Sequence, residues 1–303
     1  MRSSRVILNG GVGNQLWQLA FAHKLIKTRP VELLKIEKMK SEQNVHLESG
    51  AKVVAKIVSN CAHNLRFKTK DFQNLISKGK YVPESRFSRI FGRAIVDSRR
   101  LDYRDFNKIN ISSPYTHLGF YQSLKFLQDE VQTILDELEL LFLERPIPSI
   151  FKNTRDYAVI HIRGGDYYSA KHVNIFGVLA DQYYVHLVEE LKSQGFKKIF
   201  VLTDDSLRAR MRLEKINKLE LEFVPKLDEI STLHIMSNAK VMCTANSSFS
   251  WWGGMLAARR GGKTFVPFPW FVSDTITSSA TDPYDSNMIK VNAVFLDKQA
   301  FYQ

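Results

Sequence analysis

The stretch Tyr157-Ala-Val-Ile-His-Ile-Arg-Gly-Gly-Asp166 runs from a short apolar segment into a tight turn of glycines and polar residues. The N-terminus has the same order, since the apolar segment that ends at Asn9 leads directly into Gly10-Gly-Val-Gly-Asn14. A short apolar strand that ends in a glycine turn ahead of a helical pattern is typical of α/β proteins. The sequence therefore predicts two α/β halves, each opened by one of these strands.

Strand-like and helical patterns alternate along the rest of the chain, which favours parallel sheets. The boundary between the halves is predicted at Glu144-Arg-Pro-Ile-Pro-Ser149, where two prolines follow a long helical pattern. Residues 1–148 and 149–303 then form two α/β domains, with a cleft lined by the carboxyl ends of their strands. The clearest predicted strands are 6–9, 157–162, 198–202, 240–244 and 263–266, and the clearest helices are 14–27, 123–143, 181–194 and 230–237.

Composition indicates a folded globular protein, because 44% of the 303 residues are hydrophobic and no long low-complexity tract appears. Cys61 and Cys243 are too few for a disulfide framework and too far apart for a metal knuckle. The first apolar segment is too short for a signal peptide, and no uncharged apolar run is long enough to cross a bilayer. We therefore expect a cytoplasmic protein.

The formal net charge of +12 is concentrated in residues 51–100, which hold 12 Lys or Arg residues and three acids, a net charge of +9. Two interpretations stay open: a solvated basic face, or attraction to anionic lipid headgroups or a lipid-diphosphate acceptor, which would make the protein peripheral at the inner membrane. A nucleic-acid partner is not expected, because the segment lacks the regularly interleaved aromatic residues of a single-strand channel.

The N-terminal turn is built for close contact with a ligand, because glycine permits a backbone approach that a side chain would forbid. A dinucleotide fingerprint would need a third glycine where Leu16 stands, and no Gly-Lys-Ser/Thr of a phosphate loop follows. Gly11, Gly13 and Asn14 are the candidate binding residues, and the Asn14 amide can both donate and accept hydrogen bonds. A purely structural turn remains the alternative.

The second turn suits an anion. Residues two apart on a strand share a face, so His161 and Arg163 project together. The guanidinium of Arg163 matches phosphate oxygens bidentately, and the two glycines after it let backbone N–H groups approach the same anion. The alternative is an ion pair between Arg163 and Asp166 that only holds the turn.

A third constellation, Asn246-Ser-Ser-Phe-Ser-Trp-Trp-Gly-Gly254, lies between a strand and a helix. Ser247, Ser248 and Ser250 can cap the helix, or they can form an anion site with its N–H groups and dipole. Asn246 and Phe249 complete this candidate site. Trp251 and Trp252 are expected to pack in the core rather than to form a sugar platform.

Asp204 and Asp205 follow another predicted strand, in Thr203-Asp-Asp-Ser206. Paired acids can bind a metal, or they can accept hydrogen bonds from a base or a ribose. Metal-dependent sugar transferases often hold Mn²⁺ on such paired acids. We favour the metal-free role, because Arg163 and a helix N-terminus would already neutralise the diphosphate that leaves in such a transfer. Asp205 as an N-cap of the next helix is the alternative.

The order of these motifs resembles the α-1,2-fucosyltransferase family (glycosyltransferase family 11), bacterial type. The motifs are Gly-Val-Gly-Asn-Gln15, Gly119-Phe-Tyr-Gln-Ser123, His-Ile-Arg-Gly-Gly-Asp-Tyr167, Thr-Asp-Asp205, Ala-Asn-Ser-Ser-Phe-Ser-Trp-Trp-Gly253 and Pro267-Phe-Pro-Trp270. The resemblance extends from about Val6 to Trp270, and the serine–tryptophan string is its most specific part.

The resemblance implies a GT-B-like fold, with two Rossmann-like domains facing a central cleft, the acceptor on the first domain and the donor on the second. It implies inverting, metal-independent transfer of L-fucose from GDP-fucose, without a cofactor, to O2 of a terminal β-galactose or similar sugar. The acceptor would be a galactose-containing oligosaccharide or lipid-linked glycan of surface polysaccharide or O-antigen biosynthesis.

The family's functional residues correspond to positions already singled out. His161 and Arg163 would hold the donor, with Arg163 on the β-phosphate, and the serine-rich helix start would form the second wall. Asn14 would face donor and acceptor, and Asp166 is the nominated general base, with His161 behind it. The full predicted donor-binding set is Gly11, Gly13, Asn14, His161, Arg163, Asp204, Asp205, Asn246, Ser247, Ser248, Phe249 and Ser250.

One residue departs from the family pattern. The turn usually reads His-x-Arg-Arg-Gly-Asp, and this chain has Gly164 where the second Arg is expected. Because of this departure, two alternative functions stay open: a fucosyltransferase that forms another linkage, or a transferase that uses another GDP-sugar. A non-enzymatic polyanion-binding protein is the remote alternative.

Overall fold

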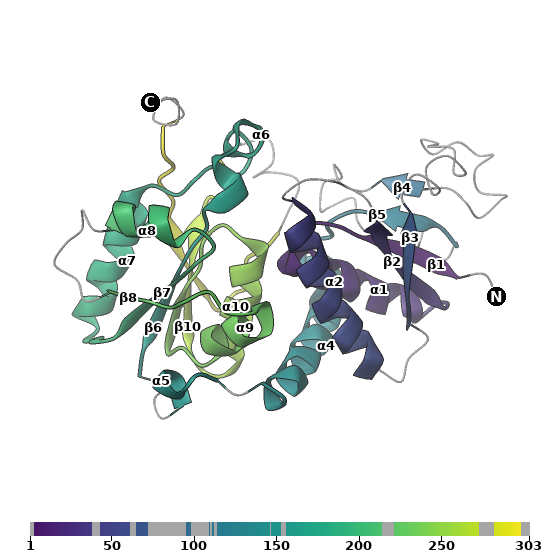
Figure 1. Ribbon diagram of the computed structural model, residues 1–303, viewed down its shortest axis with the longest axis horizontal. Coiled ribbons are helices and arrows are strands. Elements are labelled where there is room, and N and C mark those ends of the chain that lie inside the picture. Colours follow the sequence, from purple (N-terminus) through teal and green to yellow (C-terminus); the bar gives the residue numbers. More distant parts are fainter. Residues whose placement is uncertain are drawn as a thin grey trace. The chain divides into compact units, whose positions relative to one another are not determined.

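The computed structural model describes residues 3–37, 43–60, 65–71, 95–97, 109, 111, 114–145, 147–152, 156–213, 221–272 and 282–297. The chain divides into two compact units (Figure 1). The first unit comprises Met1–Leu141 with Ser279–Pro283, and the second comprises Phe142–Ser278 with Tyr284–Gln303.

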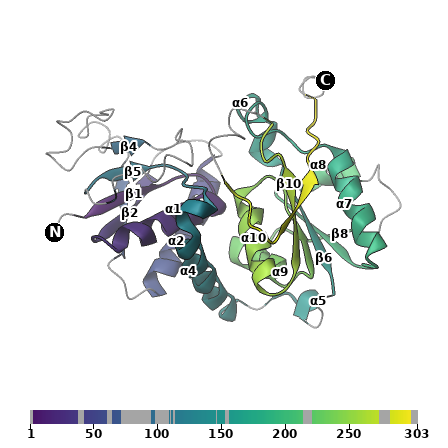
Figure 2. The same ribbon diagram turned by 180° about the vertical axis from the view of Figure 1, so that it is seen from behind.

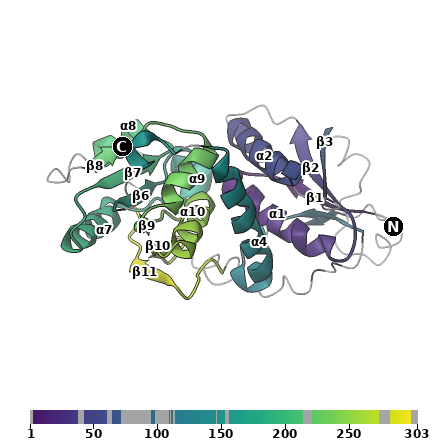
Figure 3. The same ribbon diagram turned by 90° about the horizontal axis from the view of Figure 1, so that it is seen from below.

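The first unit is a parallel α/β unit. Its described strands form a five-stranded sheet in the order β3-β2-β1-β5-β4, in which every neighbouring pair is parallel. Figures 2 and 3 show α1, α2 and α4 grouped beside this sheet. The elements are β1 (Ser4–Leu8), α1 (Val12–Ile26), β2 (Val31–Glu37), α2 (Gln43–Asn60), β3 (Leu65–Asp71), β4 (Ile95–Asp97), β5 (Thr116–Leu118) and α4 (Leu124–Leu143).

The second unit has a six-stranded parallel sheet in the order β11-β10-β9-β6-β7-β8. Counted within the unit this order is 6-5-4-1-2-3, the strand order of the doubly wound dinucleotide-binding fold. The elements are α5 (Ser149–Lys152), β6 (Ala158–Ile162), η2 (Gly165–Tyr168), α6 (Ala170–Val173), α7 (Asp181–Ser193), β7 (Ile199–Thr203), α8 (Ser206–Leu213), β8 (Leu221–Phe223), α9 (Glu229–Ser237), β9 (Val241–Cys243), α10 (Ser248–Arg259), β10 (Lys263–Phe268) and β11 (Met288–Asn292).

The sheet of the second unit is covered on both faces, which is why its strands are continuously apolar rather than alternating. α7 and α8 lie on one side of the sheet, and α9 and α10 lie on the other (Figure 1). β6 and β9 are buried along their whole length. The prediction of two α/β domains with parallel sheets is confirmed, as are the predicted strands at β1, β6, β7, β9 and β10.

α10 packs unusually close to its neighbours. A Cβ at Gly254 would lie 2.6 Å from the Thr264 methyl on β10, and one at Gly253 would lie 2.4 Å from the Met236 sulfur on α9. The glycine pair therefore lets the helix approach the sheet and α9 together. Trp251 and Trp252 are 1% and 0% exposed. This burial confirms that the two tryptophans pack in the core.

The boundary between the units differs from the predicted one. It lies between Leu141 and Phe142, inside α4, rather than after residue 148. Phe142 stacks on His234 of α9 at 4.6 Å, so the end of α4 packs with the second unit. The first unit also includes a distant segment, because Asp282 forms a parallel bridge with Ser123. Neither contact could be recognised from the prolines at the predicted boundary.

Most of the basic segment 51–100 lies outside the described residues, and so does Cys61. Of this segment the structure describes the end of α2, β3 and β4. The two interpretations of its charge therefore stay open. None of the helices in the described part of the chain combines the length and the apolar character that a membrane span needs.

One buried histidine makes stability depend on pH. His117 of β5 is fully buried, and neither ring nitrogen has a hydrogen-bond partner among the described residues. Burial, with a smaller contribution from Arg29, lowers the pKa of His117 from 6.5 to about 3. Between these two values the unfolded chain binds a proton that the folded unit does not bind. This difference lowers the free energy of unfolding as the pH falls.

We predict that His117→Phe, which keeps the ring edge-to-face with Phe21 at 5.2 Å, reduces the loss of stability in acid. The free energy of unfolding of the variant should exceed that of the unmodified protein by about 1.4 kcal/mol more for each pH unit below pH 6.5. Urea unfolding between about pH 4 and pH 7 measures it. The exposed His186→Gln serves as the control, and equal pH dependence in all three proteins would contradict the prediction.

Candidate functional site

Two of the predicted motifs meet at one edge of the second sheet. β6 and β9 are neighbouring parallel strands, so their carboxyl ends lie at the same edge. The chain leaves β6 toward β7 on one side, while β9 and β10 lie on the other. Such a reversal of strand order opens a crevice where open α/β sheets bind their ligands. Arg163–Asp166 follows β6, and Asn246–Ser250 follows β9.

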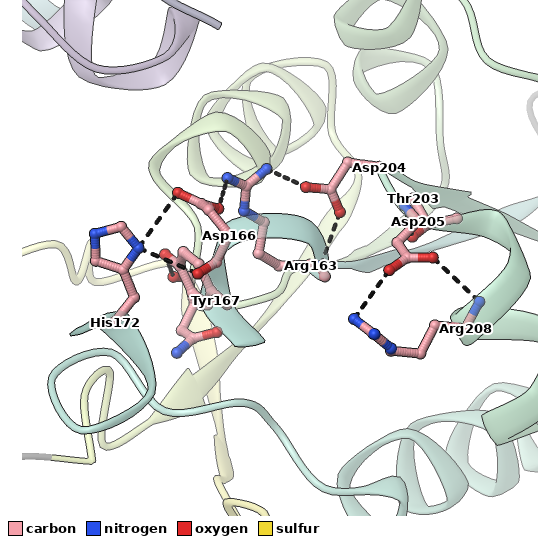
Figure 4. Close-up of polar contacts among 10 residues, drawn as sticks. Arg163, Asp166, Tyr167, His172, Thr203, Asp204, Asp205 and Arg208 are labelled. Carbon is pink, nitrogen blue, oxygen red and sulfur yellow. Dashed lines mark hydrogen bonds and ion pairs between the residues drawn. The ribbon is translucent and has the colours of Figure 1, made fainter. Parts of the chain in front are cut away.

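Arg163 is held between two carboxylates. Its guanidinium donates hydrogen bonds to Asp204 on one side and to Asp166 on the other (Figure 4). It also lies over the ring of Tyr167, 5.1 Å from the centroid. Burial opposes the charge, but the neighbouring Asp204, Tyr167 and Asp166 outweigh burial and raise the pKa of Arg163. The side chain therefore stays a cation, and 18% of it is exposed.

Asp204 fixes the turn as well as the guanidinium. One carboxylate oxygen accepts from Arg163, and the other accepts from the backbone N–H of Gly164 at 2.7 Å. A Cβ at Gly164 would lie 2.8 Å from the Asp205 Cβ, and one at Gly165, where φ is +49°, would lie 2.9 Å from an Asp204 oxygen. The glycines let the segment after β7 close onto this turn. The second Arg of the family pattern has no space at position 164.

Asp205 turns away from Arg163. Its carboxylate accepts from the backbone N–H and the guanidinium of Arg208, each at 3.2 Å (Figure 4). These contacts are those of an N-terminal cap on α8, the alternative considered for Asp205 in the sequence. Within the described ranges, no group of three or more His, Cys, Asp or Glu side chains is placed to hold a metal ion.

His172 contacts the carboxylate of Asp166, a contact that the sequence analysis did not predict. Its Nδ1 lies 3.7 Å from one oxygen of that carboxylate, 3.1 Å from the Asp166 carbonyl oxygen and 3.2 Å from the Ser169 hydroxyl. The Asp166 side chain is 37% exposed, the most accessible of the three groups in the Arg163 cluster. Asp166 thus has a cation on one side and an imidazole on the other.

His161 is buried at the end of β6, with 5% of its surface exposed. Its Nδ1 has no hydrogen-bond partner in the part of the chain that the structure describes. Burial lowers the pKa of His161 to about 4; nearby Asp204 partly opposes the effect and Arg163 adds to it. The imidazole is therefore neutral at neutral pH, and His161 does not add a second cation beside Arg163.

The start of α10 is tied to the turn after β6. Tyr167 donates from its hydroxyl to the Asn246 carbonyl oxygen at 2.8 Å, and burial raises the pKa of this phenol. The Asn246 amide donates to the Phe176 carbonyl oxygen at 2.8 Å. Asn246 therefore links the start of α10 to the turn that contains Tyr167 and to the segment that contains Phe176.

The serines of this motif have different environments. Ser247 occupies the N-cap position of α10, but its side chain makes no capping hydrogen bond. Ser250 is fully buried and donates back to the carbonyls of Ala245 and Ser247. Ser248 and Phe249 are partly exposed at the helix start, and the Phe249 ring lies 6.2 Å from that of His161. The accessible part of the motif is thus Ser248 and Phe249.

The N-terminal turn lies in the first unit. Gly11 and Gly13 flank the start of α1, and Gly13 is buried. The Asn14 side-chain oxygen accepts a hydrogen bond from the Gln122 amide at 2.7 Å. These residues belong to the first unit, and the cluster around Arg163 belongs to the second.

The chain is similar in sequence to two bacterial glycosyltransferases and in fold to a third. An alpha-1,2-colitosyltransferase of Escherichia coli is 24% identical over 302 residues, covering 94% of this chain and 97% of that protein. The O-antigen biosynthesis glycosyltransferase WbnK of Escherichia coli is 23% identical over 313 residues, covering 91% and 98%. The structure of Escherichia coli heptosyltransferase WaaC with ADP is similar with a TM-score of 0.49, at 14% identity, covering 96% of this chain and 93% of that chain.

The family model described as Glycosyl transferase family 11 matches residues 94–290. The match covers more than half of the chain and includes the Arg163 cluster and the start of α10. The chain therefore belongs to glycosyl transferase family 11.

Proposed function

We propose that the chain transfers L-fucose from GDP-fucose to a hydroxyl of a glycan acceptor, O2 of a terminal β-galactose or a similar sugar, with inversion and without a metal ion. The observation that carries the proposal is the position of Arg163, a permanent cation directly after β6, in the turn whose Tyr167 is hydrogen-bonded to Asn246 ahead of α10. A guanidinium and a helix N-terminus are the two groups that most readily bind a diphosphate.

In the proposed reaction Arg163 exchanges one carboxylate for the diphosphate. Asp204 and Asp166 each accept from a different terminal nitrogen of the guanidinium, so they compete with a phosphate for the end of the side chain that makes a bidentate contact. Asp166 is the more exposed carboxylate, at 37% against 20% for Asp204. The β-phosphate therefore displaces Asp166, while Asp204 keeps the guanidinium in place through its second bond to Gly164.

This exchange gives Asp166 its catalytic role. Once released from Arg163, the carboxylate accepts the proton of the acceptor hydroxyl as that oxygen bonds to the anomeric carbon of fucose. The bond from the anomeric carbon to the β-phosphate oxygen breaks, and GDP leaves with the electron pair. Arg163 and the start of α10 stabilise the charge that develops on GDP. His172, 3.7 Å from the carboxylate, keeps Asp166 in place.

Transfer of colitose is the second candidate, because a relative that matches 94% of this chain is named an alpha-1,2-colitosyltransferase. Colitose is L-fucose without its 3-hydroxyl, so the two donors make the same demand on Arg163. The name of WbnK supports an acceptor from O-antigen synthesis. We accordingly propose that the reaction takes place in the cytoplasm, on an oligosaccharide or lipid-linked glycan, and that the positive charge of residues 51–100 attracts the protein to an anionic membrane surface.

The direct test is incubation of the purified protein with a galactose-terminated acceptor and a panel of GDP-sugars in the presence of EDTA. The proposal expects transfer of fucose to form an α-1,2 linkage, and linkage analysis of the product checks this. Preference for GDP-colitose would select the second candidate. A strict need for Mn²⁺ or the absence of transfer would contradict the proposal.

Arg163→Ala should weaken the binding of GDP about 100-fold, because a charge-assisted bidentate contact to a phosphate is lost. Isothermal titration calorimetry measures the affinity, and the melting temperature shows whether the fold is kept. Arg210→Ala is the matched control, since Arg210 is exposed on α8 and stacks over Phe223 instead. Equal affinity for GDP in all three proteins would mean that the diphosphate binds elsewhere.

Gly164→Arg restores the residue that the family pattern expects, and we predict that it impairs donor binding rather than improving it. The new Cβ would lie 2.8 Å from the Asp205 Cβ, so the segment Asp204–Asp205 must move. Because Asp204 is part of this segment, its contact with Arg163 must shift as well. Gly164→Ala should already weaken GDP binding about tenfold. Gly195→Ala is the control for GDP binding, because its new Cβ has no heavy atom within 4 Å; its φ of +84° affects stability and leaves the Arg163 cluster untouched. Tighter GDP binding by the arginine variant would refute the packing argument.

A further inference from the structure

The motif Gly119–Ser123 takes no part in the Arg163 cluster, and the structure places it at the corresponding edge of the first sheet. β1 and β5 are neighbouring parallel strands, so the turns after them, Asn9–Gly11 and Gly119–Gln122, lie at the same edge. β1 has β2 on its other side, and the strand order therefore reverses between β1 and β5. This is the position in an open α/β sheet where a ligand crevice forms.

The two turns are tied together by one buried amide. Gln18 of α1, which is fully buried, accepts from the backbone N–H of Asn9 and donates to the carbonyl oxygen of Gly119, each at 2.9 Å. A single side chain thus fixes the spacing between the end of β1 and the end of β5.

The turn after β5 is held in a strained conformation. Tyr121 has φ of +53°, in the left-handed region that a residue with a side chain rarely occupies. Its ring stacks on Phe21 of α1 at 3.9 Å, and Gly119 leaves room for it, since a Cβ there would lie 2.6 Å from the ring. Strain of this kind persists where the surroundings enforce it, and it is concentrated at binding sites. Its effect here is to direct the next residue, Gln122.

Gln122 donates from its amide nitrogen to the Asn14 side-chain oxygen at 2.7 Å. Asn14 is positioned in turn by Gly10, which has φ of +73° and where a Cβ would lie 2.5 Å from the Asn14 amide nitrogen. The contact uses one N–H of Gln122, so its second N–H and its carbonyl oxygen remain for a ligand. Asn9, in the same edge, has a buried amide nitrogen without a hydrogen-bond partner among the described residues.

The described turns after β1 and β5, residues 9–11 and 119–122, carry no charged side chain. Asn9, Asn14 and Gln122 carry paired donors and acceptors but no charge. Asp282, whose backbone N–H donates to the Gln122 carbonyl, has its carboxylate paired with Lys125 at 3.5 Å. An anion would find no cation in the Asn14–Gln122 contact, whereas a sugar hydroxyl, which both donates and accepts, matches an amide.

We infer that Asn14 and Gln122 bind hydroxyl groups of the acceptor glycan, and that Gln122 determines acceptor recognition. The inference rests on the proposed transfer reaction, and it assigns Asn14 to the acceptor in addition to its predicted place in the donor site. Gln122→Ala should raise the KM for a β-galactoside acceptor about tenfold and leave the affinity for GDP unchanged, because hydrogen bonds to a neutral sugar are lost.

The experiment has a kinetic and a binding arm. Kinetics with lactose and GDP-fucose give the acceptor KM, and saturation-transfer NMR detects lactose on the protein without turnover. Gln122→Glu, which keeps the size of the side chain, serves if the alanine variant does not fold. Gln128→Ala, at an exposed glutamine of α4, the helix that follows the turn, is the matched control and should behave as the unmodified protein.

The outcomes separate this inference from the proposed function. Loss of the lactose signal in the Gln122 variants, with unchanged calorimetric GDP binding, supports the inference. A full lactose signal and an unchanged acceptor KM in these variants overturn it, even if fucose transfer proceeds. A protein that binds lactose through Gln122 but does not bind GDP would instead overturn the donor proposal.

Discussion

The carboxylate of Asp204 is the constraint on which the charged site depends. One oxygen orients the guanidinium of Arg163, and the other fixes the backbone of the turn at Gly164. A planar side chain held from two directions loses little further entropy when it binds a phosphate, because its geometry is already set. The requirement for glycine at positions 164 and 165 follows from the same contact, since any Cβ there would enter the space of Asp204 and Asp205.

The sequence predicts the fold well where strands are long, apolar and followed by a glycine turn. β1 and β6 could be recognised in this way, because both are almost wholly buried and a glycine turn follows each. β5 could not, since it spans three residues and includes His117. Its identity as a strand comes from pairing with β1, more than 100 residues earlier. The strand order likewise depends on long-range pairing, which local periodicity does not record.

The residues of the site could be listed from the sequence, but their partners could not. Arg163 was singled out by its side-chain chemistry and by the glycines after it. Adjacent Asp204 and Asp205 appeared equivalent, yet one binds Arg163 and the other caps α8. His172 carried no signal, because only the folding of η2 and α6 returns it to the Asp166 carboxylate. Motif spacing fixes which side chains reach the sheet edge, and tertiary packing decides which of them stay accessible.

The two units have the same backbone arrangement at the point where the strand order reverses, but they place different side chains there. In each, a glycine turn follows the first strand, and the strand order reverses between that strand and its neighbour. The second unit fills this position with a guanidinium and two carboxylates, whereas the first fills it with the amides of Asn14 and Gln122. The sheet supplies only the location, and the side chains decide the ligand class. This difference supports the proposal that GDP binds to the second unit, where the Arg163 cation would offset the desolvation of an anion.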